Sequence, residues 1–199
     1  MNKIAWPVSE LSVLHRGALL RHFMALDRDD RRLRFGTPRS DTALRAYVAS
    51  IDFERDALFG VFDEELELIG AAHVARAHGH AELGVSVLRE QRNQGVGGAL
   101  LARAAMRARN WGVRALFIHC LRENEAIMHL ARRQGMRIVT EAGEAEAWLG
   151  LAPADASTHF GELFAQRIAL FDYTFKSQFA GARRLLEAGL SFSQAKGDE

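Results

Sequence analysis

The stretch Val85–Leu101 reads Val-Ser-Val-Leu-Arg-Glu-Gln-Arg-Asn-Gln-Gly-Val-Gly-Gly-Ala-Leu-Leu. Its first residues are typical of a β-strand and its last of a helix, and Gly95, Gly97 and Gly98 lie between them. The first backbone N–H groups of a helix have no acceptor inside it, and they point outward with the positive end of the helix dipole. Because glycine brings no Cβ, a ligand can approach this backbone closely. The stretch therefore predicts a phosphate site, beside which Arg92 adds a positive charge.

Two familiar phosphate motifs do not fit these glycines. A Walker loop needs lysine and then serine or threonine after its last glycine, whereas Ala99 and Leu100 follow here. The dinucleotide fingerprint needs a third glycine at position 100, which is leucine. On the glycines alone, a helix start that holds no ligand is the other interpretation.

The flanking segments predict a mixed sheet. Three short apolar segments on tight turns are typical of an antiparallel meander. After the glycines come a helix, an apolar strand, a second helix that ends at Gly135, and a closing pair of strands. A strand–helix–strand unit pairs its strands in parallel, so the sheet contains both orientations. The expected strands are residues 57–62, 66–75, 81–88, 113–120, 136–140 and 145–151, and the expected helices are 99–111 and 125–134.

Two helices are expected before the sheet, with a charged run between them. Ser9 or Ser12 is a candidate cap for a helix that ends near Leu26, and Ser40 precedes the second helix. Residues 27–39 hold five arginines and three aspartates and contain a Gly-Thr-Pro turn signal. We interpret this run as a solvated face whose charges pair with one another, and the alternative is a docking surface for an acidic acceptor.

The C-terminal part, residues 157–190, carries an apolar stripe at helical spacing. We expect one long amphipathic helix, or two joined by Gly181, and we expect the stripe to be buried. Its candidate partners are the chain's own domain, a second copy in a homodimer and, less favoured because acidic residues offset the basic ones, a membrane surface. The stripe consists of Phe160, Phe164, Ile168, Phe171, Phe175, Phe179, Ala182 and Leu186.

The composition is that of an ordinary soluble protein with one domain and an appendage. The chain has 199 residues and a formal net charge of +1, which gives no strong attraction to nucleic acid or to an anionic membrane. No window approaches the roughly 18 uncharged apolar residues of a membrane span, and the start has no signal-peptide pattern. A single cysteine, Cys120, cannot form an internal disulfide. We therefore expect a cytoplasmic protein that binds neither nucleic acid nor membrane.

Two motifs, in the right order and at the right separation, resemble the GNAT acetyltransferase superfamily. The first is Arg92-x-x-Gly95-x-Gly97 after a valine-rich strand, which is similar to the pyrophosphate loop of that family. The second is Asn124-x-x-Ile127-x-x-Leu130-x-x-x-x-Gly135-Met136, which is similar to the family's Asn-x-x-Ala-x-x-Leu-Tyr-x-x-x-Gly-Phe segment.

The resemblance covers residues 57–150 well and extends over the first 56. It implies an α/β fold of the acyl-CoA N-acyltransferase type, built on an α+β mixed sheet. On this basis residues 1–153 form the GNAT domain and residues 154–199 a helical extension.

The same resemblance implies an acetyl-CoA site and no metal. The backbone amides of Arg92, Asn93, Gln94, Gly95, Val96, Gly97 and Gly98 would hold the pyrophosphate of the coenzyme. Val85 and Val87 would pair their backbones with the pantetheine arm, as an added strand does. Asn124 would contact the coenzyme near the far end of the cleft, although its position before Glu125 also suits a helix N-cap.

The implied reaction is direct transfer of the acetyl group to an amine, carried by a small molecule or a protein. An alkyl amine titrates near ~10.4, so the acceptor must lose a proton before it attacks. Family members often carry a carboxylate on the strand before the loop, which makes Glu82 the candidate base. The alternative is an exposed glutamate at a strand edge. A backbone N–H near Val87 would stabilise the oxyanion.

One position departs from the family pattern. The tyrosine that usually protonates the leaving thiolate falls on Ala131 here. His119, Tyr47 and Tyr173 are possible substitutes, and an unassisted thiolate is the other option because the thiol has a reference pKa of about 8.5. Direct transfer needs no enzyme nucleophile, so Cys120 is interpreted as a packing residue. A module that binds acyl-CoA without catalysis and acts through the C-terminal helix is the alternative function.

Histidines at positions 73, 78 and 80 do not predict a metal site. No cysteine or carboxylate lies at zinc-ligand spacing from them, and His78 and His80 flank a glycine turn.

Overall fold

The computed structural model describes residues 6–195 and the side chains of residues 6–177. In this part of the chain seven strands form one sheet in the order β1-β2-β3-β4-β5-β7-β6. The strands are β1 Ser9–Leu11, β2 Ala57–Phe62, β3 Leu68–Arg76, β4 His80–Val87, β5 Ala115–Leu121, β6 Arg137–Glu141 and β7 Glu144–Gly150. The helices are α1 Arg16–Ala25, α2 Arg28–Phe35, α3 Asp41–Ser50, α4 Val96–Asn110, α5 Glu125–Arg133 and α6 Ala156–Ala195, with short 3-10 turns at η1 Val13–His15 and η2 Arg89–Gln91.

The sheet is mixed, as the sequence predicts. Strands β2, β3 and β4 form the antiparallel meander, and β5 pairs with β4 in parallel through the α4 crossover. The closing strands β6 and β7 are antiparallel, and β7 is inserted between β5 and β6. The predicted fold class is therefore confirmed.

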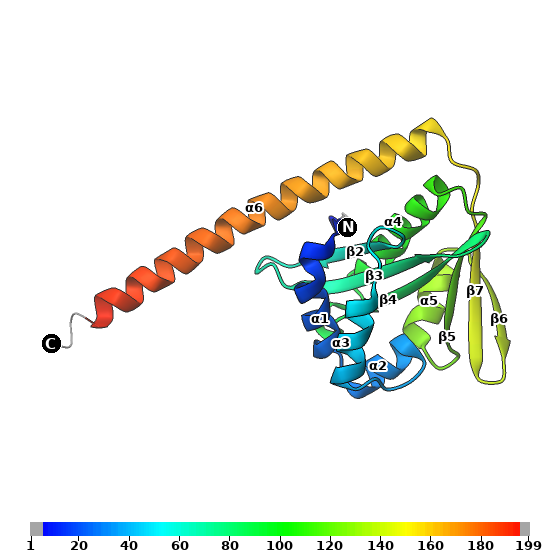
Figure 1. The fold of residues 1–199 in the computed structure, drawn as a ribbon, viewed down its shortest axis with the longest axis horizontal. Coiled ribbons are helices and arrows are strands. Elements are labelled where there is room, and N and C mark those ends of the chain that lie inside the picture. The colour runs from blue at the N-terminus through cyan, green and yellow to red at the C-terminus, as the bar shows by residue number, and fades with distance from the viewer. Residues whose placement is uncertain (1–5, 196–199) are drawn as a thin grey trace.

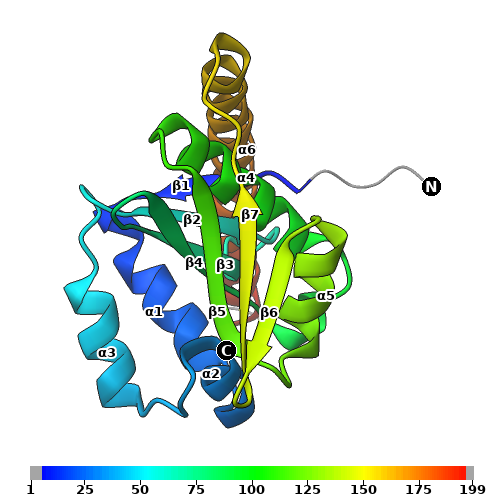
Figure 2. The same cartoon turned by 90° about the vertical axis from the view of Figure 1, so that its right-hand side faces the viewer.

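Two apolar cores lie on opposite faces of the sheet. Helices α4 and α5 cover one face, and α1, α2 and α3 cover the other (Figure 2). Strand alternation divides β4 between them: Leu83 and Val85 belong to the α4 core, and Gly84 and Ser86 face the other helices. Residues on one strand thus reach two different environments.

The first 40 residues differ from the sequence prediction in two places. Ser9 begins a strand that pairs with β2, so it caps no helix. Ser12, the other candidate cap, is confirmed as the N-cap of η1, which leads into α1 and its end beside Leu26. The charged run contains a helix, α2, which Asp27 caps by accepting a hydrogen bond from the Asp30 amide at 2.8 Å. The high charge of the run gives no apolar helical periodicity, so the sequence does not predict this helix. Its N-cap and its left-handed end at Gly36 are nevertheless regular.

The run is also not a face that pairs only with itself. Asp30 is buried and pairs with Arg92, 2.7 Å away, and Arg32 pairs with Glu123. Arg92 directly precedes the glycine loop and Glu123 follows the end of β5, so the run connects α2 to both.

The C-terminal part is a single helix in the described backbone, and Gly181 lies inside it. It contacts α4 and β1 and then runs on past the domain (Figure 1). Of the candidate partners for the stripe, the chain's own domain does not cover it in the described part of α6: Phe160, Phe164 and Phe171 are at least two-thirds exposed. At about 100° per residue these side chains point opposite to the buried Ala169. Phe179, Ala182 and Leu186 lie outside the described side chains.

A buried ion cluster attaches α6 to the domain. Glu162 accepts hydrogen bonds from Arg103 at 2.8 Å and from Arg107 and Asn110 of α4. Burial by itself raises the pKa of Glu162, but these hydrogen bonds and the arginine charges outweigh it, so the pKa is lowered. Polar contacts, rather than the phenylalanine stripe, therefore attach α6.

Replacing Glu162 by alanine should loosen α6 without unfolding the sheet. Arg103, whose side chain is 3% exposed, loses its closest carboxylate, which should cost roughly 1–3 kcal/mol of unfolding free energy. We expect faster amide hydrogen exchange along residues 156–177, measured by mass spectrometry. Arg167→Ala, an exposed change on the same helix, is the matched control. Unchanged exchange in Glu162→Ala would contradict this account of α6.

Candidate functional site

The sheet contains a gap between its two central parallel strands. Strands β4 and β5 pair over three positions, the last being Glu82 with Phe117. Beyond this point Leu83–Val87 have no β5 partner, although β4 remains paired with β3 and β5 with β7. At the closed end Phe117 packs on Trp148, with ring centroids 4.4 Å apart. The gap therefore opens towards the glycine loop.

The backbone of β4 directs hydrogen-bonding groups into this gap. Leu88 donates to Ile69 across the β3–β4 ladder at 2.9 Å, so alternate residues pair with β3. Antiparallel alternation then turns the N–H and C=O groups of Val85 and Val87 away from β3. Their side chains pack on the α4 side. Apart from the Val87 carbonyl, which accepts a hydrogen bond from Arg92, this is the edge that an extended ligand could pair with as an extra strand.

The glycine loop begins α4 next to the open end of the gap. Asn93 and Gly95 have φ angles of +61° and +92°, which turn successive N–H groups to one side. Within the described residues, no hydrogen bond to a protein acceptor forms at the N–H groups of residues 93–98, and the first bond into the helix is from Ala99 to Gly95. Six N–H groups without a protein acceptor at a helix N-terminus are suited to bind a phosphate, and phosphate binding by them stays a prediction.

Arg92 has a structural task in this loop. Its Nε donates to the Val87 carbonyl at 3.1 Å, and Asp30 pairs with its guanidinium. Its own N–H donates to Arg89 at 3.3 Å, so the free donors begin at Asn93. The Trp6 indole donates to the Gln94 carbonyl at 2.8 Å. A direct contact of Arg92 with a diphosphate stays a prediction.

Helix α5 closes the other side of the gap. Asn124 is its N-cap: the amide oxygen accepts from Ile127 at 3.2 Å and the amide nitrogen donates to Leu33 of α2 at 3.1 Å. Contact of Asn124 with a coenzyme is untested and stays a prediction. Ala131 is fully buried in the core, so it supplies no polar group.

Glu82 is exposed on the face of β4 that α2 covers, beside a chain of three polar side chains. The Tyr47 hydroxyl lies 2.7 Å from Nδ1 of His73, and Nε2 of His73 lies 2.9 Å from Asp56. With the proton on Nε2, His73 donates to Asp56 and accepts from Tyr47, which satisfies all three groups. His73 is opposite Gly84 in the β3–β4 register, so this chain lies one strand away from the gap.

The electrostatics keep His73 neutral. Burial is the main cause of its lowered pKa, the hydrogen bond to Asp56 opposes it, and the charge of Arg34 adds to it. A neutral imidazole between a phenol and a carboxylate can accept a proton from the first while the second holds it in place. Sequence reasoning missed this chain because α3, β3 and the loop before β2 each supply one member.

The other titratable candidates serve packing or lie elsewhere. Burial raises the pKa of the Cys120 thiol, which disfavours a nucleophilic thiolate. His119 contacts Glu144 at 3.1 Å on the exposed face of β5, and Tyr173 packs on Phe62 of β2. Among the described residues no group of three histidine, cysteine or acidic side chains could hold a metal ion.

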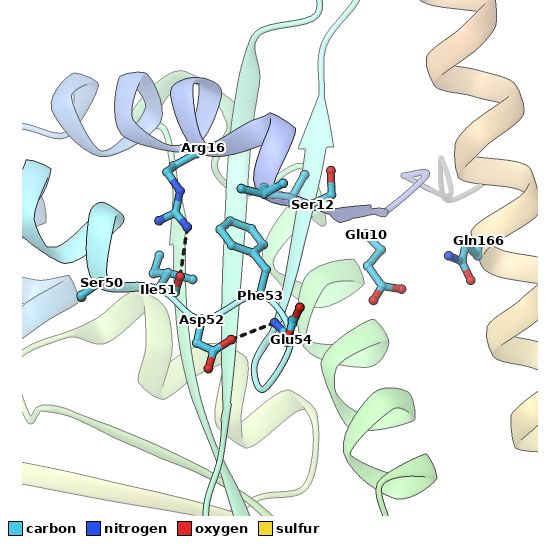
Figure 3. Close-up of a pocket in the computed structure, with 11 residues that line it drawn as sticks. Glu10, Ser12, Arg16, Ser50, Ile51, Asp52, Phe53, Glu54 and Gln166 are labelled. Atoms are coloured by element: carbon cyan, nitrogen blue, oxygen red, sulfur yellow. Dashed lines mark hydrogen bonds between the residues drawn. The ribbon is translucent and has the colours of Figure 1, made fainter.

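A hollow of about 800 Å³ lies away from this gap, between β1, the loop after α3 and α6. Arg16, one of its walls, donates to the carbonyl groups that end α3, including that of Ile51 at 3.1 Å, and stacks on Phe53 (Figure 3). The guanidinium of Arg16 is thus occupied by local structure. We assign the chemistry to the gap.

The comparisons agree with this geometry. The family model described as "Acetyltransferase (GNAT) family" matches residues 21–136, more than half of the chain. The chain therefore belongs to the GNAT family of acetyltransferases, whose general reaction is acetyl transfer from acetyl-CoA. No curated protein matches the chain. In the described residues no helix is long and apolar enough to cross a bilayer.

Solved structures share the fold at low sequence identity. The GNAT domain of S. lividans PAT is 19% identical, with a TM-score of 0.64, over 72% of this chain and 89% of that one. A phosphinothricin acetyltransferase from Sinorhizobium meliloti, in complex with AcCoA, is 16% identical, with a TM-score of 0.61, over 77% and 95%. The ribosomal-protein-S18-alanine N-acetyltransferase from Escherichia coli is 18% identical, with a TM-score of 0.56, over 75% and 96%.

The buried His22 beside the gap should make the protein sensitive to acid. Its Nε2 lies 2.8 Å from Ser86 and its Nδ1 2.7 Å from the Leu68 carbonyl. Burial lowers the pKa of His22 to about 4, against the opposing hydrogen bond to Leu68. Between that value and about 6.5 the unfolded chain binds a proton that the folded chain excludes. The free energy of unfolding therefore decreases as the pH is lowered through this range.

The slope is about 1.4 kcal/mol per pH unit, so from pH 7.5 to pH 5 this group should cost roughly 2 kcal/mol. Urea unfolding at the two pH values measures the loss. His22→Gln should show a loss smaller by that amount, whatever its stability at pH 7.5. Identical losses in both proteins would exclude His22 as the source.

Proposed function

We propose that the chain transfers the acetyl group of acetyl-CoA directly to an amine. The observation that carries the proposal is that two sets of backbone N–H groups without a protein acceptor lie next to each other. One set is on the open edge of β4, and the other is at the start of α4. Residues Asn93–Gly98 would hold the diphosphate and the Val85 and Val87 backbones the pantetheine arm. A Cβ at position 98 would meet nothing within 4 Å, so there is room for a phosphate at this point.

For the chemical step, Glu82 is the proposed base. It lies at the last paired position before β4 and β5 separate, where the thioester would meet the acceptor. The amine gives its proton to Glu82, directly or through water, and its nitrogen forms a bond to the thioester carbonyl carbon. The carbon–sulfur bond then breaks, and the sulfur leaves as a thiolate that takes up a proton. A backbone N–H near Val87 would stabilise the intermediate oxyanion.

The Tyr47–His73–Asp56 chain supports a second assignment, that of the acid. Of the three proposed substitutes for the missing tyrosine, Tyr47 is the one that contacts His73, the β3 partner of Gly84. We propose that its phenol gives a proton to the departing sulfur and regains one from solvent, while the neutral His73 and Asp56 hold the hydroxyl in position. The free thiol of Cys120 is the support for a cytoplasmic location.

The alternative is a module that binds acyl-CoA without catalysis and acts through α6. The exposed stripe favours it, because an apolar helix face of this kind is a contact surface rather than a stable solvent face. The same stripe supports a homodimer through α6. Release of free thiol with a panel of amines and lysine peptides separates the two functions: tight coenzyme binding with no turnover of any amine favours the module.

A single negative charge at position 98 should separate folding from coenzyme binding. Gly98 lies in the first turn of α4, so Gly98→Asp should leave the unfolding free energy unchanged or raise it by up to ~1 kcal/mol. The carboxylate would repel a diphosphate there, and we expect coenzyme A to bind at least ~10-fold more weakly in calorimetry. The neutral Gly98→Asn is the control. Equal affinity for wild type and Gly98→Asp would remove the diphosphate from this loop.

Two substitutions should distinguish the base from the acid. Glu82→Gln should lower kcat by ~100-fold or more and remove the rise of rate with pH, while coenzyme affinity stays the same. Tyr47→Phe should lower kcat most at high pH, because few other protonated groups remain there to donate a proton to the leaving sulfur in place of the phenol. Steady-state pH profiles of the three proteins measure both effects. A Glu82→Gln enzyme with wild-type rate and profile would exclude this glutamate as the base.

A further inference from the structure

Arginines of α2 and of the segment after it lie next to the gap, on the sheet face opposite to α4. Arg31 and Arg32 have carboxylate partners, Asp41 at 2.7 Å and Glu123. Arg34 and Arg39 differ from them. Within the described part of the chain neither guanidinium has a carboxylate oxygen within 4.0 Å, and the Nε of each is buried without a hydrogen-bond partner.

The guanidinium of Arg34, a residue of α2, lies over β4, the strand that borders the gap. Its guanidinium packs on Gly84, where any Cβ would collide with it. It stacks over the Phe35 ring at 4.8 Å from the centroid, and its closest polar contact is a long one, 3.5 Å to the Tyr47 hydroxyl. Aromatic rings and a glycine therefore fix the orientation of Arg34, while its strongest hydrogen-bonding capacity stays unused.

Arg39 adds a second cation to the same aromatic group. Its guanidinium lies 5.1 Å from the centroid of Phe35 and 5.8 Å from that of Tyr47. Placing two partly buried cations together without an anion is unfavourable, since each loses water and they repel each other. A planar guanidinium held in one orientation is suited to bidentate binding of a carboxylate or another oxyanion.

The position of Arg34 limits what that anion belongs to. Gly84 is two residues beyond Glu82, the proposed base, and opposite His73 in the register. An anion on Arg34 would thus lie within a few bonds of an amine that Glu82 deprotonates. A protein lysine with no carboxylate near its amine does not meet this requirement.

We propose that Arg34 is the acceptor-binding residue of the site, and that the acceptor is a small amine carrying a carboxylate or a similar oxyanion close to the amine. This inference rests on the proposed acetyltransferase function. Arg39 contributes through its charge, and Gly84 contributes by leaving room for the guanidinium. The arginine run thereby acts as the surface for an acidic acceptor.

Matched acceptors test the proposal on the wild-type chain. Free amino acids and their carboxamides differ in the anionic group, and thiol release at saturating acetyl-CoA gives kcat/KM for each. We expect the best amino acid to exceed its carboxamide by at least ~10-fold. The carboxamide has the less basic amine, so simple reactivity would give the reverse order.

Variants then assign the preference to one side chain. Arg34→Gln should raise KM for the preferred amino acid by ~10- to 100-fold and change its carboxamide little, and Arg34→Lys should recover part of the loss. Arg45→Gln, an exposed change on α3, is the matched control. Coenzyme affinity by calorimetry verifies that each variant is folded and keeps its other site.

The outcomes distinguish this inference from the function on which it rests. Equal kcat/KM for amino acids and carboxamides, or an equal loss for both in Arg34→Gln, overturns the anion subsite and leaves the acetyltransferase proposal intact. Lysine peptides as the best acceptors would overturn it as well. No turnover of any amine would overturn both proposals.

Discussion

An interruption of hydrogen bonding in the middle of a sheet is the constraint on which this structure depends. Backbone N–H and C=O groups are costly to leave without partners, so strands normally stay paired along their length. Here β4 and β5 pair over three positions and then diverge. The divergence persists because elements fixed by other contacts occupy both sides of it: α2 through Asp30 and Asn124, and the α4 start through Gly97, where a Cβ would lie 3.7 Å from Leu130. The edge of β4 beyond Glu82 is thereby kept unpaired.

The division of the sheet into two faces then divides the tasks. The α4 face supplies main-chain donors and small residues, a surface that suits a phosphate-rich ligand and needs few particular side chains. The opposite face supplies titratable and cationic groups from α2, α3 and β3, which suit the recognition of an acceptor. Since β4 alternates between the two faces, a one-residue shift of its register would exchange Glu82 and Gly84 for core residues. The bulge-free pairing of β3 with β4 is therefore part of the site.

Sequence alone could predict the half of the site that is local. The strand, the glycines and the helix start are contiguous, so the antiparallel meander, the parallel crossover and the free N–H groups at the helix start could be predicted. The acceptor half could not be predicted in this way. Tyr47, Asp56 and His73 meet only through tertiary packing. Arg34 is one of five arginines in its run, and only its packing on Gly84 distinguishes it from the others. The same applies to α6, whose apolar periodicity indicated its helix but not which face would dock, because the buried Glu162 and its arginines decided that.

The two ends of the gap also carry their own optical labels. The Trp6 indole is hydrogen-bonded to the carbonyl of Gln94, and a Cβ at Gly95 would lie 4.0 Å from its ring, whereas Trp148 packs on Phe117 where the strands begin to separate. Indole emission responds to the polarity and charge around the ring. Occupation of the loop and occupation of the closed end would therefore alter different indoles. Replacing Trp111 and one of these two tryptophans by phenylalanine would isolate the emission of the other, so each step of ligand entry has its own reporter.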